Sequence, residues 1–103
     1  MMNMFEMLRQ AHGMKEKLKV FQEELERQTF SASAGDGAVM VVINGKLDVQ
    51  KVTLDPRALQ SGDALKIQEW NQKAMNEAGR QAKEKLKSDV SKLTGGLDLP
   101  GLF

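Results

Sequence analysis

The first quarter of the chain carries apolar or small residues at intervals that alternate between three and four. They fall at Met4, Met7, Ala11, Met14, Leu18, Phe21 and Leu25. Such a heptad seam is typical of an amphipathic helix whose apolar stripe packs on another helix. We therefore predict a helix over residues 4–28, about 37 Å long at a rise of about 1.5 Å per residue.

The pattern changes to alternation between residues 29 and 54. Apolar residues alternate on both sides of Asn44-Gly45, a pair that strongly indicates a hairpin because both residues tolerate the positive φ of a type I′ turn. A two-residue turn places Val42 opposite Leu47, whereas a longer loop ending at Leu47 or Asp48 shifts that register. Residues 35–37 (Gly-Asp-Gly) make a second turn, so residues 29–54 are expected to form three antiparallel strands.

The predicted sheet is apolar on both sides, and the helices of one chain cannot easily cover both. We therefore expect a homodimer joined through the sheets, with a compact α+β monomer as the alternative. The side chains expected at the dimer interface share one face of the hairpin; they are Val39, Val41, Ile43, Val52 and Leu54.

Two helical segments are expected after the sheet. Asp55-Pro56 is a helix-start signature that predicts a short helical turn over residues 56–60, and Asp63 can cap a long helix over residues 63–94. Alanines at positions 74, 78 and 82 permit close approach of another element. The two long helices are expected to pair antiparallel, with far ends that project beyond the sheet, and residues 95–103 to form a flexible tail.

Length and composition favour one small domain over residues 1–103. The absence of cysteine excludes a disulfide framework and fits a cytoplasmic protein. No segment has the length and apolarity of a membrane span or the pattern of a signal peptide, so no membrane partner is expected. The formal net charge is only +1, so a nucleic-acid partner requires basic residues that are segregated in space.

The search for catalytic chemistry yields no enzyme. His12 is the one histidine in the sequence, and without cysteine it has no second soft ligand with which to hold a metal. Gly35-Asp36-Gly37 lacks the residues that complete a phosphate-binding loop. We expect no catalytic residue, metal, cofactor or small-molecule substrate.

Basic residues gather in two segments that suggest a surface for duplex DNA. If the long helices are antiparallel, residues 9–19 lie alongside residues 80–92, away from the acidic residues 23–26. A solvated, salt-bridge-laced helix surface is the alternative, and a helical adaptor that holds another polypeptide through the Met-rich seam is a second. The residues predicted to contact DNA phosphates are Arg9, Lys15, Lys17, Lys19, Arg80, Lys83, Lys85 and Lys87.

The order of several short motifs resembles the YbaB/EbfC family of bacterial nucleoid-associated proteins. They are Gly35-x-Gly37-x-Val39-x-Val41, Asn44-Gly45, Leu54-Asp55-Pro56, Met75-Asn76-Glu77-Ala78, Thr94-Gly95-Gly96-Leu97 and Leu99-Pro100-Gly101-Leu102. The resemblance implies an α/β homodimer whose helices project like tweezers from central sheets. It also implies that the dimer binds DNA and alters its conformation on the cytoplasmic nucleoid, with effects on nucleoid organisation and gene expression.

Overall fold

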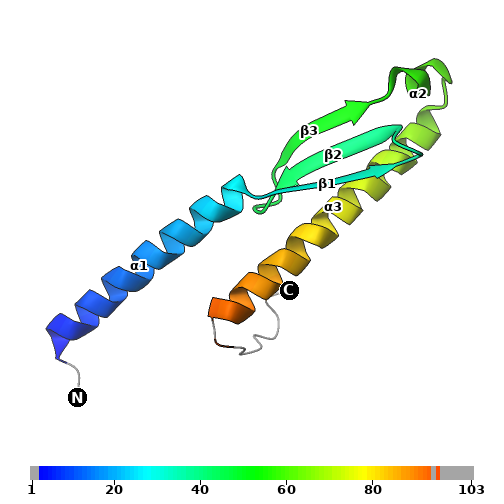
Figure 1. The fold of residues 1–103 in the computed structure, drawn as a ribbon. Coiled ribbons are helices and arrows are strands. Elements are labelled where there is room, and N and C mark those ends of the chain that lie inside the picture. The colour runs from blue at the N-terminus through cyan, green and yellow to red at the C-terminus, as the bar shows by residue number, and fades with distance from the viewer. Residues whose placement is uncertain (1–2, 94, 96–103) are drawn as a thin grey trace.

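The computed structural model describes residues 3–93 and 95 and has the predicted α+β order of elements (Figure 1). These elements are α1 (Met4–Arg27), β1 (Thr29–Ala34), β2 (Val39–Asn44), β3 (Val49–Leu54), α2 (Pro56–Gln60) and α3 (Ala64–Leu93). The predicted helix stop and tail after Leu93 lie, apart from Gly95, outside the described residues.

Each helix begins at a side chain that caps its first turn. The Oδ1 atom of Asn3 accepts a hydrogen bond from the backbone N–H of Glu6 at 2.8 Å. Asp55 accepts from the N–H of Arg57 at 2.9 Å, and Asp63 from the N–H of Lys66 at 3.1 Å. These side-chain oxygens accept from backbone donors that have no partner inside the helix, which confirms Asp55 and Asp63 as the predicted caps.

The three strands form one antiparallel sheet in the order β1-β2-β3. Val39 lies opposite Leu54 and Val41 opposite Val52. Val42 therefore lies opposite Lys51, not Leu47, and the two-residue turn is wrong. The loop is longer because the Asn44 side chain accepts hydrogen bonds from the N–H groups of Lys46 and Asp48, at 2.9 and 3.0 Å.

The hydrophobic core lies between the sheet and α3, which covers β1 and β2 (Figure 1). It brings three residues of β2 against three alanines of α3, all nearly or fully buried, and these are Val39, Val41, Ile43, Ala74, Ala78 and Ala82. Alanine has no side chain beyond Cβ, so the helix backbone can approach the sheet closely. The predicted helical stripe of alanines therefore packs inside one chain.

This core corrects the predicted dimer interface. Val39, Val41 and Ile43 have 0%, 0% and 4% of their surface exposed, so α3 leaves them no area for a second chain. Val52 and Leu54 lie on the same face of the sheet but belong to β3, which α3 does not cover. They are 46% and 37% exposed and remain available for contact with a second chain.

The expected pairing of α1 with α3 along their seams is also wrong. In Figure 1, α1 projects from the sheet as a separate arm, and the chain extends 70 Å along its longest axis. None of the 24 residues of α1 is buried. The alanine stripe of α3 is already covered by the sheet, so it offers no seam to α1.

The base of α1 is held by the loop between β2 and β3. The N–H of Gly45 donates to the carbonyl oxygen of Leu25 at 2.8 Å, and a Cβ at position 45 would lie 2.8 Å from the same oxygen. The Nζ of Lys46 also lies 3.1 Å from Oε1 of Glu26. Gly45 is thus required by close packing against α1, not by a turn with positive φ.

Candidate nucleic-acid interface

The projecting arm carries basic side chains that are not neutralised by carboxylates. Within the part of the chain that the structure describes, no ion pair involves Arg9, Lys15, Lys17 or Lys19. Lys15 and Lys19 are four residues apart and share a side of the helix, while Lys17 points to nearly the opposite side. Lys17 therefore stands apart from Lys15 and Lys19, and the cations do not all lie on one side of the arm.

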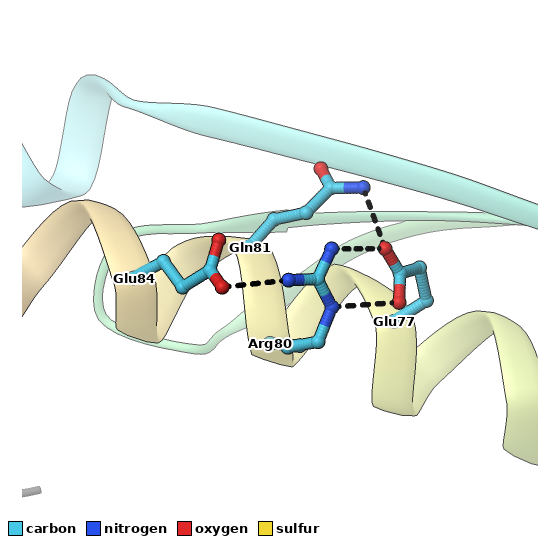
Figure 2. Close-up of polar contacts among 4 residues, drawn as sticks. All are labelled: Glu77, Arg80, Gln81 and Glu84. Carbon is cyan, nitrogen blue, oxygen red and sulfur yellow. Dashed lines mark hydrogen bonds and ion pairs between the residues drawn. The ribbon is translucent and has the colours of Figure 1, made fainter.

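Arg80 on α3 is held inside a network of acidic side chains (Figure 2). Its Nε and Nη2 donate to the two carboxylate oxygens of Glu77 at 2.9 and 2.6 Å, and its Nη1 donates to Glu84 at 2.7 Å. Gln81 donates to Glu77 as well, at 3.5 Å. Two carboxylates face one guanidinium group, so this part of α3 carries no net positive charge.

The hydrogen bonds of this network shift the acid–base equilibria of both partners. The hydrogen bond from Arg80, and then that from Gln81, lowers the pKa of Glu77 from 4.5 to about 2. The same hydrogen bond raises the pKa of Arg80 above its ordinary value. Both groups are therefore charged at neutral pH, and a phosphate would have to compete with Glu77 and Glu84 for the Arg80 guanidinium.

The three lysines of α3 that were predicted to contact DNA do not form a single cluster. The Nζ of Lys85 lies 2.8 Å from Oδ1 of Asp89, and this hydrogen bond is the main cause of the lowered pKa of Asp89. Lys83 and Lys87 have no ion pair among the described residues and share a side of the helix. Lys85 is about 200° from Lys83 around the axis and lies on another side.

α1 and α3 approach each other through their C-terminal parts. The side-chain N–H of Gln28 donates to Oδ2 of Asp89 at 3.4 Å. A hollow of about 480 Å³ lies between Val20 and Phe21 of α1 and Leu93 of α3. Residues 9–19 therefore do not lie alongside residues 80–92 as expected, because most of the arm extends past the end of α3 (Figure 1).

The heptad seam of α1 is exposed from Met4 to Leu18, whereas Phe21 and Leu25 near the base of the helix are half-buried. Met4, Met14 and Leu18 have 78%, 65% and 58% of their surface exposed. The seam was found from the sequence, but its lack of a partner within the chain was not. Asn44-Gly45 was identified from the sequence as a turn, but the hydrogen bond from Gly45 to Leu25 at the base of α1 was not foreseen.

The described residues offer little for catalysis. Among them, no group of three His, Cys, Asp or Glu side chains could hold a metal ion. Neither long helix in this part of the chain combines the length and apolarity that a membrane span needs. The pocket between the sheet and α2, about 420 Å³, is lined by Asp55, Arg57 and Trp70, and its Asp55 and Arg57 already pair at 3.0 Å.

Comparison with known proteins decides the family. Residues 1–97 match the sequence model of the YbaB/EbfC DNA-binding family. The chain belongs to this family. This confirms the resemblance that the sequence motifs indicated, and YbaB/EbfC is a family defined by DNA binding and not by an enzymatic activity.

Similar YbaB/EbfC proteins come from bacteria and cover almost the whole chain. A nucleoid-associated protein of Thermoanaerobacter pseudethanolicus is 38% identical over 101 residues, which is 98% of this chain and 91% of the relative. A nucleoid-associated protein of Acetivibrio thermocellus is 40% identical over 102 residues, with 98% and 90% covered. The chain therefore matches proteins described as nucleoid-associated over about nine tenths of their length.

A solved structure supports the fold. The crystal structure of the uncharacterized protein HP0035 from Helicobacter pylori superposes with a TM-score of 0.79. The match covers 91% of this chain and 99% of that one at 20% sequence identity. At this identity the likeness extends to the α+β fold alone.

Proposed function

We propose that this YbaB/EbfC protein binds duplex DNA as a homodimer, mainly through phosphate contacts, and alters its conformation. It acts on the nucleoid in the bacterial cytoplasm and so affects nucleoid organisation and gene expression. The observation that carries the proposal is the arm formed by α1, whose cations Arg9, Lys15, Lys17 and Lys19 have no ion-pair partner among the described residues.

The cations differ in how readily they reach a phosphate. Lysines without a carboxylate partner exchange only water and counterions for the phosphate, and the released counterions drive binding. Lys15, Lys17, Lys19, Lys83 and Lys87 belong to this class. Arg80 and Lys85 are held by carboxylates, so we assign them a secondary role.

The homodimer is supported by two apolar surfaces that one chain leaves uncovered. One is the seam of α1, and the other is formed by Val49, Val52 and Leu54 of β3, which are 48%, 46% and 37% exposed. A helix draws most of its stability from an apolar face packed on a neighbour. We propose that a second copy covers both surfaces, with Val52 and Leu54 in the interface and Val39, Val41 and Ile43 outside it.

Mobility shifts on a generic duplex at several salt concentrations test this function. We expect binding that weakens steeply with salt, by about 0.9 log units of affinity per phosphate contact for each decade of salt. Replacing Lys15, Lys17 and Lys19 with glutamine removes six lysines from the dimer and should lower that slope by up to about 5. The matched control replaces Arg80 and Lys85 with glutamine, which removes cations that are already paired and should change the slope by less than about 1.

Two results would contradict the proposal. No shift of the wild-type protein at low salt would exclude phosphate-led DNA binding. An equal loss of slope in both sets of variants would show that ion pairing does not decide which cations meet DNA. Sedimentation at the same protein concentration checks that the variants keep the wild-type mass.

A helical adaptor is the second candidate, and the exposed Met-rich seam favours it. Methionine is unbranched and flexible, so Met4, Met7 and Met14 can adapt to different apolar partners. This function predicts salt-insensitive binding to another polypeptide and no mobility shift of duplex DNA. The salt titration above therefore separates the two candidates.

A further inference from the structure

One side of α1, next to its seam, has a composition of its own. At about 100° per residue, its members between positions 5 and 19 fall within an arc of about 120°. Apart from Glu16, this tip face is apolar at its start and basic or histidine beyond it. Its other members are Phe5, Leu8, Arg9, His12, Lys15 and Lys19.

Phe5 is the residue of the tip face that the dimer does not explain. Its side chain is 74% exposed and that of Leu8 is 63% exposed, close to the free end of the arm (Figure 1). Phe5 lies about 160° around the helix from Met7, so a helix that covers the seam leaves the Phe5 ring in water. A single exposed apolar residue is ordinary, but this ring stands beside Leu8 at the start of a row of cations.

We propose that Phe5, supported by Leu8, is an apolar wedge that enters between neighbouring base pairs of duplex DNA. Arg9, Lys15 and Lys19 then lie on the phosphates beside the entry point. Proteins that bend DNA from the minor groove insert Phe, Leu or Met between base pairs and use nearby Arg and Lys on the groove and backbone. This inference rests on the proposed DNA binding and names the residue that would change the DNA conformation.

The distribution of charge favours DNA over an anionic membrane. A helix that lies in a membrane surface needs an apolar face along much of its length. On the tip face, apolar side chains occupy only the first turn, and the next three turns carry Arg9, His12, Lys15 and Lys19 together with the one carboxylate Glu16. A short wedge followed by a row of cations fits a base step flanked by phosphates. The positive end of the helix dipole, at the capped N-terminus, adds to the attraction for phosphate.

The experiment measures bending and affinity separately with the full chain. A duplex of about 30 base pairs, shorter than the persistence length of DNA, carries a donor and an acceptor dye at its ends, and energy transfer reports bending. We expect Phe5→Ala to lose most of the bending signal and about tenfold in affinity, because the unstacked step is no longer filled. Phe5→Leu should keep most of the bending.

The matched control is Leu65→Ala. Leu65 is 77% exposed but belongs to the first turn of α3, at the other end of the molecule (Figure 1). Its replacement removes a similar exposed apolar surface and should leave bending and affinity unchanged. Circular dichroism and sedimentation check that each variant keeps the helix content and mass of the wild type.

The outcomes distinguish the wedge from the proposed function. If the wild type binds DNA and Phe5→Ala bends it to the same extent, the wedge is overturned and the proposed DNA binding stands. A wild-type protein that binds no duplex overturns both. Loss of sedimenting mass in Phe5→Ala overturns the wedge by assigning Phe5 to the interface between copies. Vesicles of phosphatidylglycerol and phosphatidylcholine test a lipid surface. If they bind the wild type but not Phe5→Ala, and Phe5→Ala bends DNA as the wild type does, the tip face binds lipid and the wedge is overturned.

Discussion

α1 and α3 are both long amphipathic helices, but only the apolar stripe of α3 is buried within the chain. Ala74, Ala78 and Ala82 of α3 are buried against the sheet, whereas none of the residues of α1 is buried. The charges differ in the same way, since Arg80 and Lys85 of α3 are paired and the lysines of α1 have no ion pair among the described residues. The contrast shows that similar periodicity describes both a helix that builds its own core and a helix available for a partner.

The largest expected effect tests whether the core under α3 belongs to one chain. Val41→Asp places a carboxylate in the fully buried layer between β2 and α3, where no partner is available to it. We expect the free energy of unfolding to fall by at least about 3 kcal/mol, enough to unfold the chain. Circular dichroism during urea titration at fixed protein concentration measures the loss.

Val52→Asp is the control for that substitution. Val52 lies opposite Val41 on the same face of the sheet but is 46% exposed. We expect its replacement to keep the fold and to shift the sedimenting mass towards the monomer. A folded, cooperative Val41→Asp protein would show that α3 does not seal this layer.

A smaller effect compares alanines on the two helices. Ala78→Leu forces extra volume between α3 and the sheet, so we expect a loss of about 1–3 kcal/mol in the free energy of unfolding. At a protein concentration low enough for the monomer to predominate, Ala11→Leu adds the same atoms to the uncovered seam of α1 and should cost less than about 0.5 kcal/mol. Thermal and urea unfolding of the two variants measure the difference. Equal losses would mean that α1 is packed as tightly as α3 in the protein as it exists in solution.

The smallest effect concerns the charges of α3. Because the hydrogen bond from Arg80 lowers the pKa of Glu77 from 4.5 to about 2, ionised Glu77 favours the folded state. This contribution is complete above pH 4.5 and is lost as the pH falls through about 2. We expect Glu77→Gln to lower the melting temperature slightly at pH 7, because the pair is exposed to water. The difference in melting temperature between wild type and variant should disappear near pH 2. A difference that stays constant with pH would show that the ion pair with Arg80 is not its cause.

The fold was largely predictable because its signals are local. Heptad spacing, strand alternation and the caps Asp55 and Asp63 each depend on a few neighbouring residues. The hairpin register was not predictable, because Asn44 uses its side chain to close a longer loop and Gly45 is required by α1. Both reasons involve contacts that exist only after the chain has folded.

The candidate site was predictable in composition but not in arrangement. The sequence shows which residues are basic, and the structure decides which of them are already paired. Arg80 has Glu77 and Glu84 at helical spacing, so its neutralisation could have been anticipated from intervals of three and four residues. The isolation of α1 could not have been anticipated, because it depends on the alanine stripe of α3 being packed against the sheet.

The contact between Gly45 and Leu25 fixes the base of α1 and therefore its orientation. α1 contains 24 residues and is a rod of about 36 Å, so a rotation of about 10° at its base moves its tip by about 6 Å. The hydrogen bond of 2.8 Å between the Gly45 N–H and the Leu25 carbonyl thus sets the position of side chains near Phe5, far along the rod. The reach of the arm is therefore decided in a loop that touches none of the residues at the tip.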